Sequence, residues 1–156
     1  MGLMEGKVVV VTGGGNGIGR AYCQGIAKEG GTVVVADIDG AAAEGVVKTI
    51  TDSSGKALGV EVDVANSASC QLMAKKALAN FGKIDGLINN AAIFMSVPVT
   101  KGGWQEIDEQ EWDRVMAVNV KRLWLTSRAV VPAMQQRSRE VSLISPRTWR
   151  LTADLQ

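Results

Sequence analysis

Residues 8–19 read VVVVTGGGNGIG, a β-branched run that passes directly into closely spaced glycines. A continuous valine run is typical of a strand buried on both faces of a parallel sheet. Glycine permits positive φ in a turn and lets the backbone approach a pyrophosphate closely. A helix starting there would aim its unpaired N–H groups and positive dipole end at the phosphates. The stretch therefore predicts a strand, a nucleotide-binding turn and a helix.

The glycine spacing is G-x-x-x-G-x-G at Gly13, Gly17 and Gly19, not the commoner G-x-G-x-x-G. The context of a preceding strand and a following helix makes the motif credible. No Gly-Lys-Ser/Thr follows, which excludes a Walker loop. The plain alternative is a glycine-rich surface turn.

The rest of the chain alternates strand-like and helix-like segments. Strands are predicted at residues 7–12, 32–36, 57–62 and 86–89, with a short one at 141–144; helices are predicted at 18–28, 41–50, 67–81 and about 108–136. This alternation predicts an α/β fold, a doubly wound parallel sheet of the Rossmann type with three α/β/α layers. Asp108 and Glu111 have the form of a capping box, and Pro132 predicts a kink or break in the last helix.

Composition sets limits on function. A length of 156 residues suits one domain, and a net charge of +1 gives no indication of nucleic acid or membrane partners. The absence of histidine excludes a His-based triad and removes the commonest metal ligand. Cys23 and Cys70 form no spacing motif, which predicts packing roles in a reducing compartment. The apolar run near the N-terminus is too short for a signal or a span, so a cytoplasmic location is predicted.

Two carboxylates follow predicted strands. Asp37 lies 24 positions after Gly13 and suits hydrogen bonding to an adenosine ribose diol. It would repel a 2′-phosphate, and no cation flanks it, so NAD is favoured over NADP. The alternative is a helix cap, a role for which Asp39 is equally suited. Asp63 can meet an adenine amino group at the edge of the sheet, or can serve as a turn residue before Asn66.

Three asparagines stand at unusual places. Asn89 and Asn90 close the fourth strand, where amides can tie neighbouring strands and contact a cofactor, although a simple turn is the alternative. Asn119 lies between Val118 and Val120 in a predicted helix, for which asparagine has a low propensity. A buried structural amide and a role in a site are both open for Asn119.

Taken together, these motifs resemble the short-chain dehydrogenase/reductase family over about residues 5–136. The resemblance implies NAD as cofactor and assigns the following binding residues: Gly13, Asn16, Gly17, Ile18, Gly19, Asp37, Ile38, Asp63, Val64, Asn90, Ala91 and Ala92. Ala92 stands where the family usually has glycine. Asn119 would be the catalytic asparagine, which places a water in a proton relay. The family passes hydride between nicotinamide and an alcohol or carbonyl substrate.

The resemblance fails for the remaining catalytic residues. The family's Ser and Tyr-x-x-x-Lys belong after the position of Asn119, but Tyr22 is the only tyrosine and no lysine follows Lys121. Pro146 stands where the serine is expected. We therefore predict no turnover by this chain alone. A non-catalytic dinucleotide-binding or oligomerisation module is the alternative, with a homodimer or homotetramer formed through the helix around Trp112 and Trp124, and another Rossmann-type nucleotide binder is least favoured.

The sequence divides into an NAD-binding domain at residues 1–138 and an aberrant tail at 139–156, from which the family's C-terminal part is missing. The pattern specifies no regular element for the last ten residues. One hypothesis is a shifted reading frame: synonymous codons for residues 139–152, read out of phase, can give Gly-Ser-Ile-Ile-Asn-Ile-Ser-Ser-Asn-Val-Ala-Phe-Asn. A chain ending this way would expose a sheet edge and apolar helix faces, which predicts low stability or aggregation.

Overall fold

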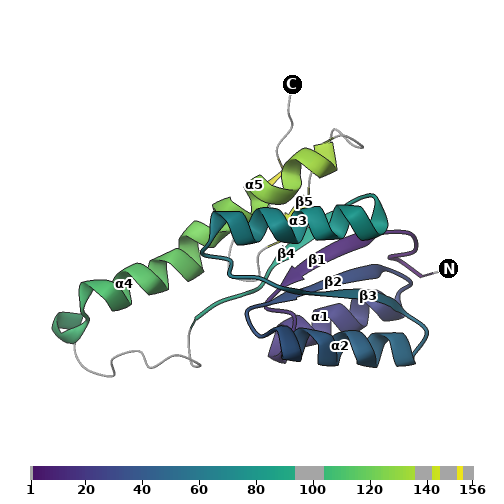
Figure 1. Ribbon diagram of the computed structural model, residues 1–156, viewed down its shortest axis with the longest axis horizontal. Coiled ribbons are helices and arrows are strands. Elements are labelled where there is room, and N and C mark those ends of the chain that lie inside the picture. Colours follow the sequence, from purple (N-terminus) through teal and green to yellow (C-terminus); the bar gives the residue numbers. More distant parts are fainter. Residues whose placement is uncertain (1, 94–103, 136–141, 145–150, 153–156) are drawn as a thin grey trace.

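A sheet covered by helices on both faces forms the body of the protein (Figure 1). The computed structural model describes residues 2–93, 104–135, 142–144 and 151–152. The strands are β1 (Val8–Thr12), β2 (Thr32–Asp37), β3 (Lys56–Glu61), β4 (Gly86–Asn89), β5 (Ser142–Ile144) and β6 (Leu151–Thr152). The helices are α1 (Gly17–Lys28), α2 (Gly40–Asp52), α3 (Ser67–Phe81), α4 (Glu109–Met116) and α5 (Arg122–Gln135), with a 3-10 turn η1 (Trp104–Glu106) and a π-helical segment η2 (Ala117–Lys121).

The strand order is β3-β2-β1-β4-β5-β6, and β1 to β5 are parallel. This confirms the predicted doubly wound α/β sheet. The short strand predicted at 141–144 is present as β5. The last ten residues, for which the sequence pattern specifies no element, contain β6 at Leu151–Thr152, which pairs antiparallel with β5 and so satisfies its backbone groups. The rest of that segment lies outside the described residues.

The valine run of β1 builds both halves of the core. Val10 packs on the face covered by α3 and α5, while Val9 and Val11 pack on the face covered by α1 and α2. All five residues of β1 are buried, as a central strand of a parallel sheet requires. The continuous apolar run, without the alternation of a half-exposed strand, therefore places β1 in the middle of the sheet.

Three helices begin with a side-chain cap. Asp39, Asn66 and Asp108 each accept a hydrogen bond from the backbone N–H three residues on, at 3.0, 3.0 and 2.7 Å. Each cap satisfies one of the otherwise unpaired N–H groups of the first turn and contributes about 1 kcal/mol to stability. The Asp108 cap confirms the predicted start of the fourth helix.

The helix predicted at about 108–136 is observed with one irregularity. Residues 109–135 form α4, η2 and α5 in succession, and Figure 1 shows α4 extending away from the sheet. Pro132 lies within α5 and does not end it, whereas the change of hydrogen-bond pattern occurs at η2. Single π-helical turns of this kind occur often at functional sites. Asn119 lies in η2.

A polar clamp fixes the amino-terminal edge of the sheet. Asp85 accepts the backbone N–H of Val8 at 2.8 Å and forms an ion pair with Lys83 at 2.8 Å; Lys83 also donates to the carbonyl of Gly6. Burial alone would raise the pKa of Asp85, but the hydrogen bonds from Lys83 and Val8 and the charges of Lys83 and Lys7 outweigh it, so the pKa lies below its ordinary value. The clamp joins the chain before β1 to the start of β4.

Candidate functional site

The candidate site lies where β1 and β4 end side by side. Thr12 and Asn89 are paired in register at the carboxyl ends of these strands, and the chain leaves β1 and β4 toward opposite sides of the sheet. In an open parallel sheet, this switch in strand order leaves a crevice outside the carboxyl ends in which ligands bind.

Two positions of the glycine-rich turn, Gly13 and Gly19, have no room for any residue other than glycine. A Cβ on Gly19 would lie 1.9 Å from the carbonyl oxygen of Gly13, and one on Gly13 would lie 2.8 Å from the Cα of Ala91. Gly13 and Gly17 have φ of 65° and 51°. Nothing lies within 4 Å of the space beside Gly17, and the side chain of Asn16 makes no capping bond to α1. No side chain therefore caps the first N–H groups of α1, which leaves them available to a phosphate.

The carboxylate of Asp37 is held at the edge of this turn. Oδ2 accepts the backbone N–H of Gly15 at 2.8 Å, and Oδ1 accepts that of Asp39 at 3.0 Å. Asp39 is the N-cap of α2, which resolves the choice between the two acids. Asp37 therefore does not cap the helix. It is half-buried, and its two hydrogen bonds fix the orientation of its carboxylate. Ile38 beside it is exposed, and no ion pair among the described residues involves Asp37.

The structure gives Asp63 a turn role. Its Oδ1 accepts the backbone N–H of Ala65 at 2.9 Å, while its own N–H donates to the hydroxyl of Ser69 at 3.0 Å. Asn66, not Asp63, caps α3. Val64 packs its side chain into the core, so only its backbone faces the crevice. The Asp63 carboxylate remains exposed at the crevice edge.

Asn90 and Thr12 tie the two central strand ends together. The Asn90 side chain donates to the carbonyl of Gly13 at 3.1 Å. The Thr12 hydroxyl accepts the N–H groups of Asn90 and Ala91 at 3.1 and 3.2 Å and donates to the carbonyl of Ile88 at 3.4 Å. The predicted tie by an asparagine amide is confirmed for Asn90. Ala91 lies against the turn, and Ala92 is exposed beyond it.

The side-chain amide of Asn119 makes two hydrogen bonds with a single residue. Its Nδ2 donates to the carbonyl of Ile93 and its Oδ1 accepts the N–H of Ile93, both at 2.9 Å. This pair joins η2 to the segment after β4 and supports the structural reading of Asn119. The π-helical turn brings the asparagine to the rim of the crevice.

Sequence reasoning missed a polar group beneath β4. The Arg122 side chain is 6% exposed and donates from Nη1 to the carbonyl of Asn89 at 3.1 Å, while its Nε is buried without a partner. The hydroxyl of Thr126 donates to Oδ1 of Asn89 at 2.6 Å. Burial lowers the pKa of Arg122. The sequence offered one indication that Arg122 is buried: it lies three residues before Leu125, on the apolar face of α5.

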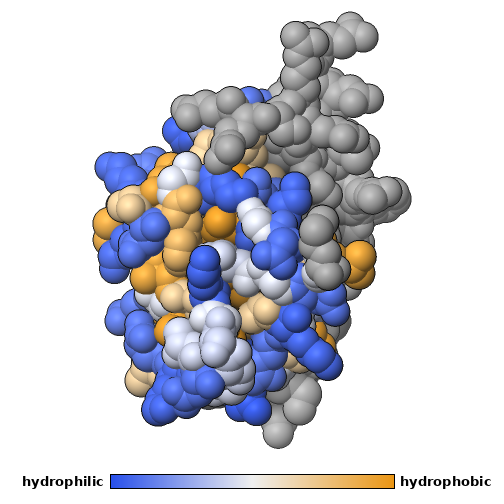
Figure 2. Space-filling model, turned by 90° about the vertical axis from the view of Figure 1, so that its right-hand side faces the viewer, coloured by the Kyte–Doolittle hydropathy of each residue, from blue (hydrophilic) through white to orange (hydrophobic). Residues whose placement is uncertain are grey.

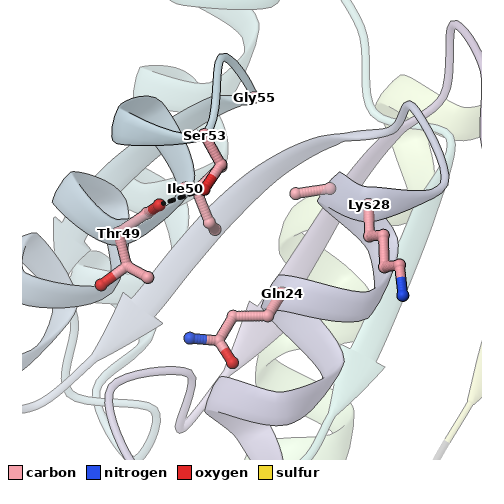
Figure 3. Close-up of a pocket in the computed structure, with 7 residues that line it drawn as sticks. Gln24, Lys28, Thr49, Ile50, Ser53 and Gly55 are labelled. Atoms are coloured by element: carbon pink, nitrogen blue, oxygen red, sulfur yellow. Dashed lines mark hydrogen bonds between the residues drawn. The ribbon is translucent and has the colours of Figure 1, made fainter.

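Other features lie apart from the crevice. Figure 3 shows a pocket of about 210 Å³ between the carboxyl ends of α1 and α2, which is the opposite edge of the sheet. Among the residues that the structure describes, no group of three acidic or cysteine side chains is placed to hold a metal. No described helix is long and apolar enough to cross a membrane.

Comparisons with known proteins agree with this geometry. A family model described as short chain dehydrogenase matches residues 7–144. Cyclopentanol dehydrogenase of Comamonas testosteroni is 35% identical over 136 residues, which cover 87% of this chain and 52% of that enzyme. The chain spans about half the length of the curated relatives that it matches.

Solved structures show the same fold with bound dinucleotides. The 3-ketoacyl-(acyl-carrier-protein) reductase of Brucella melitensis, complexed with NADH, is 33% identical and superposes with a TM-score of 0.81 over 90% of this chain and 57% of its own. A metagenomic short-chain oxidoreductase in complex with NADP is 31% identical, with a TM-score of 0.82 over 91% of this chain and 62% of its own.

Proposed function

The chain belongs to the short-chain dehydrogenase family, and from this premise we propose that its crevice binds NAD. The observation that carries the proposal is the Asp37 carboxylate, held by Gly15 beside a turn that only glycine can form. Gly13, Asn16, Gly17, Ile18 and Gly19 would surround the pyrophosphate, with the first turn of α1 supplying N–H donors.

The remaining residues divide the crevice into two halves. On the β2–β3 side, Asp37 with Ile38 would meet the adenosine ribose, and exposed Asp63 with the Val64 backbone would meet adenine. On the β4 side, the nicotinamide ribose would lie over Asn90, Ala91 and Ala92. NAD is preferred over NADP because the Asp37 carboxylate, with exposed Ile38 beside it, would repel a 2′-phosphate.

Hydride transfer is the chemistry that a bound nicotinamide supplies in this family. The protein would contribute by orienting the two rings and by moving the substrate proton. For this second task the sequence offers no Tyr-x-x-x-Lys. Asn119 is the one tetrad member present, and its side chain is committed to Ile93. General acid–base catalysis is worth about 10²–10⁴-fold, so we propose that this chain binds NAD without appreciable turnover of an alcohol or carbonyl substrate.

A second candidate function is a binding and assembly module. The α4–α5 stripe, defined as Trp112, Met116, Val120 and Trp124, recurs every four residues and is exposed, with both tryptophans more than half accessible. No residue of α4 is buried. Acidic residues predominate in α4 and just before it, although α4 also contains Arg114. The basic residues Lys121 and Arg128 come after α4. Two copies packed antiparallel would bury the stripe and oppose these charges, which is the geometry of a two-fold dimer.

We propose that residues 1–138 form the NAD-binding domain and that a shifted reading frame accounts for residues 139–156. Sequencing the gene across these codons in independent clones tests it. An uninterrupted in-frame reading that matches the present tail would sink the idea. A cytoplasmic location likewise stays a prediction.

Calorimetric titration with NAD tests the main proposal. We expect saturable binding to the wild-type chain and much weaker binding of NADP. A dehydrogenase assay with a panel of secondary alcohols should show no turnover. Absence of NAD binding by a folded chain would overturn the proposed site, whereas turnover would overturn the proposed inactivity.

A further inference from the structure

Arg122 is a buried cation for which the described residues provide no ion-pair partner. Among the described residues the ion pairs are Lys48–Asp52 and Lys83–Asp85, and neither involves Arg122. With the described residues its guanidinium makes one hydrogen bond, from Nη1 to a carbonyl, and its buried Nε makes none. An unpaired buried charge destabilises a fold, because the lost hydration is not replaced. We therefore expect this destabilising charge to serve a function.

The place of Arg122 indicates what that role is. The guanidinium lies against the carbonyl of Asn89, the last residue of β4 and the one paired in register with Thr12. Dinucleotides lie across the switch point with one mononucleotide on each side. Asp37 follows β2 and Asp63 follows β3, so both carboxylates serve the other side of β1. On the β4 side, no ion pair among the described residues neutralises the cation.

The two redox forms of the cofactor differ in charge at this side. The nicotinamide ring carries a positive charge in NAD⁺ and none in NADH, while the phosphates and adenosine are the same. We propose that Arg122 makes the site select the reduced cofactor, by repelling the charged nicotinamide ring through the protein interior. This inference rests on the proposed function, since it requires a nicotinamide dinucleotide in the crevice.

The expected size follows from Coulomb's law. For an assumed separation of about 10 Å between the guanidinium and the nicotinamide ring, and an effective dielectric of about 20, the repulsion changes the binding equilibrium by about tenfold. Added salt screens such an interaction little, because the guanidinium is buried. We therefore expect NADH to bind about tenfold more tightly than NAD⁺, with a ratio that persists at high salt.

Calorimetric titration of four chains tests the proposal: wild type, Arg122→Met, Arg122→Lys and Lys121→Met. Arg122→Met removes the charge at similar length and should bring the two dissociation constants together. Arg122→Lys keeps the charge and should keep the preference. Lys121→Met removes an exposed charge at the next position and should leave the ratio unchanged. The melting temperature of Arg122→Met should equal or exceed that of wild type.

Each other outcome is decisive. An unchanged ratio in Arg122→Met, or equal affinities in wild type, would overturn this inference and leave the proposed NAD site standing. Loss of the preference in Lys121→Met would assign it to surface charge instead. Failure of Arg122→Met to fold would show that the guanidinium has a stabilising partner, against the inference. Binding of neither form by folded wild type would overturn the proposed function and this inference with it.

Discussion

The backbone N–H of Gly15 and Oδ2 of Asp37 are joined by a 2.8 Å hydrogen bond, which links the turn after β1 to the end of β2. The carboxylate is thereby oriented before any ligand arrives. A charged acceptor held in this way discriminates between ribose hydroxyls, which donate to it, and a phosphate, which it repels.

Replacing Asp37 with Asn should relax this discrimination. Asparagine retains an acceptor for Gly15 but loses the charge, so NAD should bind about five- to tenfold more weakly and the NADP/NAD affinity ratio should rise by about tenfold. Titration with both cofactors measures this. Asp39→Asn is the matched control, because asparagine caps a helix as well as aspartate does. An unaltered ratio in Asp37→Asn would argue against a ribose contact.

Gly19→Ala should destroy the turn. The new Cβ would lie 1.9 Å from the carbonyl oxygen of Gly13, a backbone atom that cannot yield without reshaping the loop. We expect loss of measurable NAD binding. Gly25→Ala in the same helix meets nothing within 4 Å and should stabilise the protein by about 0.5–1 kcal/mol. Retained binding in Gly19→Ala would mean that the turn is not the phosphate site.

Asn119→Ala should destabilise the protein. It leaves both backbone groups of Ile93 without their partner, at a cost of about 1–3 kcal/mol. Urea denaturation measures the change in free energy of unfolding. Asn80→Ala removes an exposed asparagine whose amide bonds within its own helix, and should cost much less. Equal effects of the two substitutions would show that the Asn119 bonds do not hold η2 in place.

The contribution of Asp85 should depend on pH. Its pKa is lower in the folded chain than in the unfolded chain, so its stabilisation is present above the unfolded value of about 4 and is lost as pH falls through the folded value. Asp85→Asn should therefore destabilise the protein at pH 7, and the difference from wild type should shrink below about pH 4. Asp52→Asn, which breaks an exposed ion pair, should show a small difference throughout. A pH-independent cost of Asp85→Asn would contradict the ionic clamp.

The two cysteines report whether the chain is folded. Burial raises the pKa of Cys23 to about 12 and that of Cys70 to about 11. Almost no thiolate is therefore present at pH 8, and the side chains are inaccessible. We expect a thiol-specific disulfide reagent to react slowly with the native protein and rapidly in denaturant. Fast reaction of both thiols without denaturant would mean that the core is open.

Local patterns predicted the regular elements well. The valine run of β1, the segment Ser67–Phe81 and the strand Gly86–Asn89 were all readable, because each buries a continuous or periodic apolar set between clear end signals. Asp37 was readable too, from its distance to the glycines. Its confusion with Asp39 arose because both acids precede a helix, and only the backbone decides which one caps it.

The missed features depend on contacts between distant residues. Arg122 bonds to Asn89, and Asp85 bonds to Val8 across 77 positions, so no local pattern predicts the partner of either side chain. The π-helical turn was unpredictable for a similar reason: Asn119 forms it while bonding Ile93, 26 residues earlier. Pro132 lies inside α5, which continues to Gln135, so it does not end the helix. The predicted kink or local break in the hydrogen-bond ladder stays a prediction.

The Thr12 hydroxyl makes hydrogen bonds with three backbone groups of the segment after Leu87, at the one point where the two halves of the crevice meet. Neither half can move apart from the other without breaking them. A ligand that spans the crevice therefore meets a rigid surface and loses little affinity to ordering the protein. Most of the entropy lost on binding would then come from the ligand itself, so stiffer dinucleotide analogues should gain affinity in this crevice.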